Sequence, residues 1–335
     1  MIFIYILLLV VILYKLQYVD FNESYLSFNT TNTVKGICIL LVFVSHYNQY
    51  LFGSNFAFNS VTDRLYQLCS YFIGQWIVAM FLFYSGYGVM ESILKKGIDY
   101  VNKIPIRRIL NVLLNFDVAI ISYLILSMFL SQEISYEKVF LSFVAWDSLG
   151  NSNWYIFVIL VCYLCTYVAF KLTSKLSKAI KIISLLVLCV LVLLYYVKEP
   201  WWYDTILCFP LGIFYSYYKL HIQSILHKYS IFIIILGFIS FPFLFLCQIG
   251  VYYNFIAVAF CIFVVSFTMK FHIENAFLVW CGQHLFPLYI YERLFMILLS
   301  EFNYIEQYPL FSFSLSFILT LFVSYLFPKF QIKIK

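Results

Sequence analysis

A lysine and a histidine lie eleven residues apart in one apolar stretch, Lys35–His46, which reads KGICILLVFVSH. Eleven residues make about three helical turns, so the two side chains share nearly the same face, roughly 16 Å apart along the axis. An ionisable group inside a membrane helix is costly and is therefore a functional candidate. The imidazole of His46 could accept a proton near neutral pH. Together the two groups could hold an extended, phosphate-bearing ligand with its reactive end at the histidine.

Three further ionisable groups interrupt apolar stretches. Asp117 is expected at about the depth of His46 and could stabilise its charged form, or could be a protonated carboxyl bonded to Asn115. Glu292 and Arg293 are adjacent in CGQHLFPLYIYERLF, so their helical side chains point about 100° apart and need not pair. Glu292 could serve the acceptor side or be the partner of His46, and Arg293 could bind a phosphate or carboxylate or extend to the membrane surface. The structural alternative for His46 is a hydrogen bond to a neighbouring helix.

A basic segment offers a second charged site. The loop 91–108 carries five basic residues and ends in Arg107 and Arg108. Such a loop is typical of the cytoplasmic side of a membrane protein, and that topology signal alone could explain it. Beside Lys35 it could also bind the phosphates of a cytoplasmic cofactor.

Four other residues are weaker candidates for contact with a substrate. Ser85 precedes a glycine in FLFYSGYG, a pattern that also favours close helix packing. Trp154 and Tyr155 open an apolar stretch, where aromatic residues also anchor helices at the membrane interface. His284 lies about two helical turns before Glu292. None of these four would decide a function alone.

Composition places these residues in a membrane protein. Of the 335 residues, 64% are hydrophobic and 11% are charged, and the mean hydropathy is +0.94. Long apolar stretches predict an all-α polytopic integral membrane protein. The net charge of +6 is spread over short loops, so nucleic acid is not an expected partner. The nine cysteines lie nearly all in apolar stretches and are expected to be small buried hydrophobes, and no metal is expected.

Eleven membrane spans are predicted. Most of the 21 basic residues fall on one set of alternate loops, which is the pattern of cytoplasmic loops. This alternation places the N-terminus outside and the C-terminus in the cytoplasm. The predicted spans are 1–17, 34–51, 70–90, 108–130, 153–171, 181–197, 203–219, 229–247, 251–269, 276–298 and 308–328.

Taken in order, these motifs resemble the membrane-bound acyltransferase 3 family, which acylates hydroxyl groups on cell-surface polysaccharides and related molecules. The resemblance spans about residues 34–328, and 1–17 is an extra N-terminal transmembrane span beside a ten-helix acyltransferase core. The motifs that carry it are Lys35 with His46, Phe83 with Ser85 and Gly86, Arg107 with Arg108, Trp154-Tyr155-Ile156, and the Tyr-rich stretch from Gly282 to Tyr291.

Three positions depart from the family pattern. Lys35 stands where arginine is usual, which keeps the charge and loses bidentate phosphate geometry. Pro105 interrupts the usual R-x-x-R of the basic loop. Glu292 stands where a histidine is frequent, and the Glu-Arg pair resembles a variant found among capsule and O-antigen O-acetyltransferases.

The resemblance implies an O-acyltransferase of the bacterial cytoplasmic membrane. It would move an acetyl group from cytoplasmic acetyl-CoA to a hydroxyl of a lipid-linked or exported glycan, in contact with glycan-assembly machinery. Lys35, Arg107 and Arg108 would bind the CoA phosphates. His46 would be the general base or a transient acyl carrier, tuned by Asp117 or Glu292.

A different class of protein also fits many of these features. Numerous aromatic residues and intramembrane charges would suit a polysaccharide flippase or polymerase, or a small-molecule transporter. The sequence lacks the paired half-repeats with matching Gly/Pro breaks that would indicate a transporter. It also lacks the large polar outer loop that would indicate a polymerase. An acyltransferase-like protein without activity is a third alternative.

Overall fold

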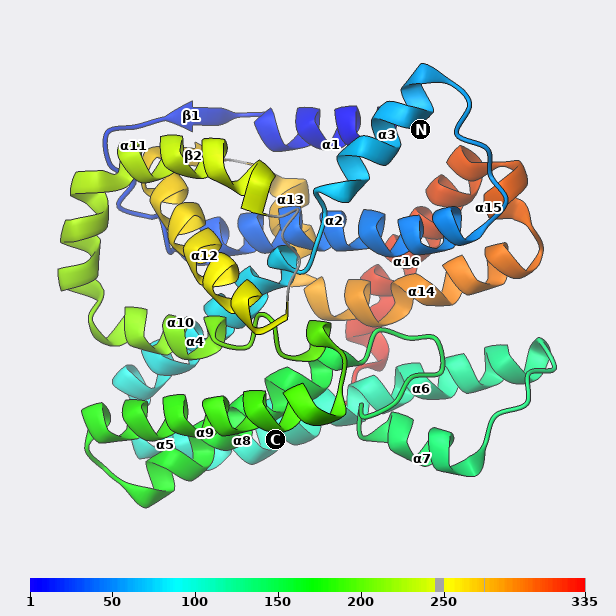
Figure 1. Ribbon diagram of the computed structural model, residues 1–335. Coiled ribbons are helices and arrows are strands. Elements are labelled where there is room, and N and C mark those ends of the chain that lie inside the picture. The colour runs from blue at the N-terminus through cyan, green and yellow to red at the C-terminus, as the bar shows by residue number, and fades with distance from the viewer. Residues whose placement is uncertain (245–249, 274, 335) are drawn as a thin grey trace.

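The computed structural model describes residues 1–244, 250–273 and 275–334, which form a bundle of helices with one short two-stranded sheet (Figure 1). The helices are α1 (Phe3–Leu13), α2 (Phe28–Gly53), α3 (Val61–Tyr71), α4 (Trp76–Lys96), α5 (Ile98–Ile104), α6 (Asn111–Phe129), α7 (Tyr136–Phe143), α8 (Trp154–Leu172), α9 (Leu176–Val197), α10 (Cys208–Tyr217), α11 (Lys219–Leu244), α12 (Tyr253–Lys270), α13 (Ala276–Gln283), α14 (Leu285–Glu301), α15 (Tyr304–Gln307) and α16 (Pro309–Phe330). A π-helical turn, Pro105–Leu110, joins α5 to α6, and 3₁₀ turns lie at Pro200–Trp202 and Gly250–Tyr252. The strands β1 (Leu16–Tyr18) and β2 (Phe271–Ile273) pair antiparallel, with Leu16 opposite Ile273.

The prediction of an all-α polytopic membrane protein is confirmed. Within the described part of the chain, eight helical segments are long and apolar enough to cross a membrane. They are Phe28–Gly53, Trp76–Lys96, Ile98–Phe129, Trp154–Leu172, Leu176–Val197, Lys219–Leu244, Gly250–Lys270 and Pro309–Phe330. The count of eleven stays a prediction.

The other three predicted spans contain shorter helices. α1 has 11 residues and rises only about 16 Å, against a hydrocarbon core of about 30 Å, so the extra N-terminal span also stays a prediction. α10 has 10 residues, and the predicted span 276–298 is divided into α13 and α14 at His284. The last residues of the predicted span 229–247 lie outside the described ranges.

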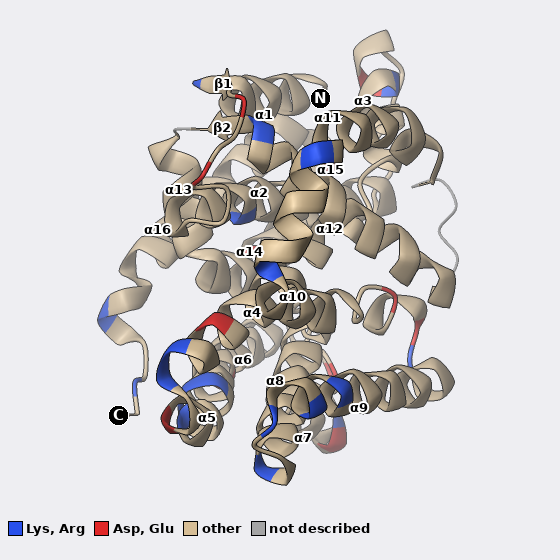
Figure 2. Ribbon diagram, turned by 90° about the vertical axis from the view of Figure 1, so that its left-hand side faces the viewer, with Lys and Arg blue, Asp and Glu red and all other residues tan. Residues whose placement is uncertain are grey.

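The basic loops gather at one end of the bundle, where α8 and α9 are joined. Figure 2 looks toward this end and shows blue Lys and Arg segments along α5, at the start of α9 and near the C-terminus. We call this the basic end. α2 begins there, so Lys35 lies nearer to it than His46 does (Figure 1).

Two helix crossings are close enough to require glycine. At the crossing of α2 and α13, a Cβ at Gly36 would lie 2.0 Å from the carbonyl oxygen of Leu278. At the crossing of α4 and α10, a Cβ at Gly86 would lie 2.1 Å from the carbonyl oxygen of Phe209. The glycine after Ser85 therefore has a packing role, because it lets two backbones touch.

Replacing Gly86 with valine is expected to lower the free energy of unfolding by about 3 kcal/mol, because backbone rather than a flexible side chain occupies the space. Gly88 lies on the same helix with nothing within 4 Å of an added Cβ, so Gly88→Val is the matched control. Thermal melting of both purified variants in detergent measures the difference. Equal melting temperatures would show that α4 and α10 do not need this close approach.

Candidate active site

A histidine and a carboxylate from distant parts of the chain meet inside the bundle. His46 lies on α2 and Glu292 on α14, and the imidazole Nδ1 is 2.5 Å from the carboxylate Oε1. Glu292 is fully buried and His46 is 9% exposed. The break at His284 ends α13 and begins α14, the helix that carries Glu292 toward α2. The structure thus brings His46 together with one of its two candidate carboxylate partners.

This pairing selects one nitrogen of His46 for chemistry. A carboxylate that accepts a hydrogen bond from Nδ1–H leaves Nε2 without a proton and able to act as a base. The hydroxyl of Ser152 lies 3.5 Å from the same Nδ1. The second carboxylate oxygen, Oε2 of Glu292, is buried without a hydrogen-bond partner among the described residues. Glu292 is therefore held mainly by the histidine and by the nearby charge of Arg293.

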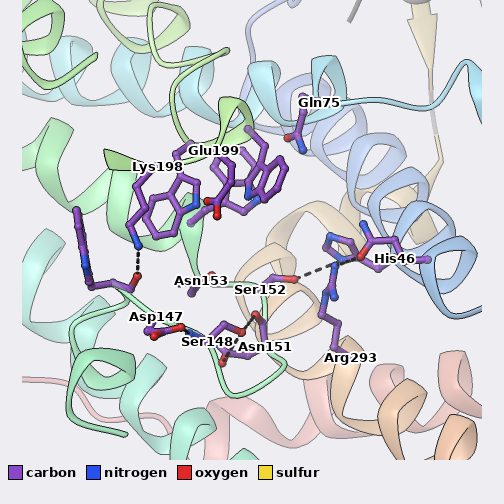
Figure 3. Close-up of a pocket in the computed structure, with 15 residues that line it drawn as sticks. His46, Gln75, Asp147, Ser148, Asn151, Ser152, Asn153, Lys198, Glu199 and Arg293 are labelled. Carbon is purple, nitrogen blue, oxygen red and sulfur yellow. Dashed lines mark hydrogen bonds between the residues drawn. The ribbon is translucent and has the colours of Figure 1, made fainter. Parts of the chain in front are cut away.

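A cavity of about 520 Å³ opens beside His46 (Figure 3). Its lining residues on α2 are His46 and Gln49, which lie toward the end of that helix away from Lys35. Its walls come from α2, from the loop before α8, from the connection between α9 and α10, and from α14. A second cavity of about 200 Å³ shares His46, Gln49, Gln75 and Trp154 with the first. The histidine therefore lies where two cavities meet.

Arg293 belongs to the wall of the larger cavity. It lines the cavity, donates a hydrogen bond to the side-chain oxygen of Gln49 and lies 5.9 Å from the ring of Tyr50. Its charge lies close enough to act on both His46 and Glu292. Arg293 is therefore placed to contact a ligand beside the histidine.

The wall opposite the histidine is aromatic and charged. The Lys198 ammonium lies 4.0 Å from the ring centre of Trp146 and 4.4 Å from that of Trp202. Burial lowers the pKa of Lys198, while the carboxylates of Glu199 and Asp147 act to raise it. Our sequence analysis did not select these residues, although tryptophans and acids crowding two polar connections were a usable signal.

The basic candidates form a second charged site near the start of α2. Lys35 and Arg108 lie close enough for their charges to repel each other. Arg108 donates from Nε to the hydroxyl of Tyr100, at 3.0 Å, and its guanidinium is 6.0 Å from the ring of Tyr163. Neither cation forms an ion pair with a carboxylate in the described ranges. Two neighbouring cations without a counter-ion suit a bound anion. Arg107, on the same π-helical turn, is exposed.

Between these two sites lies a column of aromatic side chains. Ser85 lies near the hydroxyls of Tyr155 and Tyr163. The ring of Tyr155 is 5.5 Å from that of Tyr289, which is 6.2 Å from the imidazole of His46. Ser85 and Tyr155 thus lie between the cations and the histidine, whereas Trp154 lines the cavities directly.

Asp117 and His284 are placed elsewhere. No hydrogen bond or ion pair joins Asp117 to His46 in the part of the chain that the structure describes, and Asp117 does not line the cavity. Its expected alternative partner, Asn115, instead forms two hydrogen bonds with the backbone of Ile332. The Asn115 amide donates to the carbonyl oxygen and the Asn115 side-chain oxygen accepts from the N–H, each at 2.8 Å. His284 faces a separate cavity of about 370 Å³, with Nδ1 2.9 Å from the carbonyl oxygen of Trp280. The structure thus leaves both residues out of the His46 site.

Comparison with known proteins identifies the family of the chain. A family model described as an acyltransferase domain, Acyl_transf_3, matches residues 28–327. The chain belongs to this acyltransferase 3 family and is a membrane acyltransferase. A search of curated proteins finds no match, and neither does a search of solved structures. Within the described ranges no three His, Cys, Asp or Glu side chains form a group that could hold a metal ion.

Proposed function

We propose that this membrane acyltransferase is an O-acetyltransferase that moves an acetyl group from acetyl-CoA to a hydroxyl of a cell-surface or lipid-linked polysaccharide. The observation that carries the proposal is the buried His46–Glu292 pair at the edge of a polar cavity. Acyl transfer to an alcohol needs a base for the hydroxyl proton, and a histidine oriented by a carboxylate supplies one.

The proposed reaction uses Nε2 of His46. This nitrogen takes the proton of the acceptor hydroxyl as the hydroxyl oxygen attacks the thioester carbonyl carbon. The new C–O bond forms, the C–S bond breaks, and the leaving thiolate takes the proton from the imidazolium to give free CoA and an ester. Glu292 stabilises the imidazolium while it exists, because it holds Nδ1–H. In the alternative course, His46 carries the acetyl group briefly before the acceptor takes it.

The donor would enter from the basic end, which we place in the cytoplasm of a bacterial cell. Lys35 and Arg108 would bind the CoA phosphates, with Arg107 contributing from the surface. The roughly 16 Å between Lys35 and His46 along α2 leaves room for an extended arm between phosphate and thioester. The acceptor would occupy the cavity on the other side of the histidine.

Removing either of the half-buried cations, Lys35 or Arg108, is expected to weaken donor binding. Arg108→Ala and Lys35→Ala should each raise KM for acetyl-CoA about tenfold or more, because a hydrogen bond to a charged group contributes about 1.5–3 kcal/mol. Steady-state kinetics on protein in lipid nanodiscs measures this, with exposed Lys103→Ala as the control from the same segment. An unchanged KM in both variants would show that the phosphates bind elsewhere.

Release of free CoA tests the proposed function as a whole. Purified protein in nanodiscs, given acetyl-CoA and surface glycan stripped of its acetyl esters, should release CoA in step with new ester formation. Glycan that crosses the bilayer or grows in length without CoA release would instead indicate the flippase or polymerase class.

A further inference from the structure

The cavity beside His46 has two chemically different ends. Figure 3 shows His46 and Arg293 on one side and Lys198 and Glu199 on the other. Trp146 and Trp202 lie against Lys198. The loop from Asp147 to Asn153 lies between them and lines the same cavity. A volume of about 520 Å³ falls within the range of about 300–1,000 Å³ that is usual for small-molecule sites. The reacting group at His46 therefore occupies only one end of the available space.

The far end combines a hydrogen-bond donor with aromatic surface. The Lys198 ammonium lies over the rings of Trp146 and Trp202 and donates one hydrogen bond, of 2.7 Å, to the Trp146 carbonyl oxygen. An ammonium has three donors, and this is its one hydrogen bond to the described residues, so it keeps donor capacity for a ligand. Trp201 lines the same end and is 44% exposed, which leaves an indole face for packing. Lys198 is thus held against Trp146 and Trp202 before any ligand binds.

The loop between the two ends carries unused polar groups. Asn151 is 4% exposed and lines the cavity, and its side-chain oxygen accepts from the backbone of Leu149 at 2.9 Å. Its amide nitrogen has no hydrogen-bond partner among the described residues. One oxygen of Asp147 accepts from the backbone of Ser148, at 2.7 Å, and a carboxylate has capacity for more donors. The loop therefore combines an acceptor at Asp147 with a buried amide donor at Asn151 that has no partner among the described residues.

Sugar rings match this combination. A pyranose has an apolar C–H face, which packs on an aromatic ring, and a rim of hydroxyls that both donate and accept hydrogen bonds. Binding sites of this kind use aromatic surface for contact and a few fixed polar groups for orientation. The far end of the cavity supplies the aromatic surface, and Lys198, Asp147 and Asn151 supply the polar groups.

We propose that the end of the cavity formed by Trp146, Lys198, Trp201 and Trp202 is a second sugar subsite. It binds the residue next to the one that is acylated at His46. The acceptor is then an oligosaccharide or polymer rather than a single sugar. This inference rests on the proposed function, which makes the acceptor a glycan.

Acceptor length tests the subsite. Surface glycan of the source cell, freed of acetyl esters and partly hydrolysed, gives separate fractions of single sugars and of short oligosaccharides. The wild-type protein should show a kcat/KM at least about tenfold higher for the oligosaccharides than for the single sugars. Lys198→Met and Trp201→Ala should each reduce this ratio several-fold, whereas Tyr196→Ala, on an exposed side chain outside the cavity, should keep it.

The ratio separates this inference from simpler effects. Loss of folding lowers both rates together and leaves the ratio unchanged, and Lys198→Arg, which keeps the charge, should restore part of the preference. Equal use of both fractions by the wild type, or an unchanged ratio in both folded variants, would overturn the second subsite and leave the proposed function standing. No transfer by the wild type to any fraction would overturn the proposed function and this inference with it.

Discussion

Replacing His46 with alanine is expected to lower the rate of acyl transfer about 10²–10⁴-fold, which is the usual contribution of a general base. In the proposed mechanism Glu292 accepts from Nδ1–H and Nε2 is the base, and the ring lines both cavities. Alanine removes the base and leaves the surrounding walls in place. Transfer of labelled acetyl from acetyl-CoA to deacetylated surface glycan, at matched protein levels in nanodiscs, measures the effect.

His46→Gln is the companion variant, because it keeps a polar side chain of similar reach and cannot act as a base. It should be as inactive as His46→Ala while melting near the wild-type temperature. Label that stays on the wild-type protein when acceptor is left out, and is absent from both variants, would assign the acyl-carrier course. Transfer at the wild-type rate by either variant would rule out His46 as the base.

Replacing Glu292 with glutamine is expected to slow transfer about 10²-fold or more. An amide has nearly the shape of a carboxylate but carries no charge to stabilise an imidazolium. Its NH₂ group can also donate to Nδ1, which would leave the proton on Nε2 and block the base. The carboxylate is fully buried, so water cannot replace it easily. The measurement is kcat at saturating acetyl-CoA and acceptor.

Glu301→Gln is the matched control, because Glu301 ends the same helix and is exposed. It should keep the wild-type kcat. The central pairing would be wrong if Glu292→Gln kept kcat while Asp117→Asn lost it, since Asp117 would then be the group that tunes the base.

The membrane fold was predictable because the length of each apolar stretch can be read from the sequence. α2, α4, α8 and α9 correspond to long apolar stretches with basic residues at the expected ends. The break at His284 was not predicted, because the stretch 276–298 is apolar on average. In the structure, however, the backbone ends one helix and begins another at His284. The contacts of Gly36 and Gly86 with distant backbones were likewise not readable from spacing along one helix.

Some residues of the candidate site were likewise predictable from the sequence, and others were not. His46 and Lys35 were found because a charge in an apolar helix stands out at once. The choice between Asp117 and Glu292 as partner was left open, because similar depth in a membrane says nothing about which helices touch. Lys198 was missed, because a lysine at the end of an apolar stretch has the appearance of an ordinary loop cation until Trp146 is brought beneath it.

The most direct test of the central claim is the O-acetyl content of the surface glycan, measured by proton NMR. The comparison uses the source cell, a deletion strain, and the deletion strain complemented with wild type, His46→Ala or Glu292→Gln at equal membrane levels. We predict that the acetyl signal disappears on deletion, returns with the wild type and stays low with both variants. An acetyl signal that persists in the deletion strain, or that either variant restores in full, would contradict O-acetyl transfer by the His46–Glu292 pair.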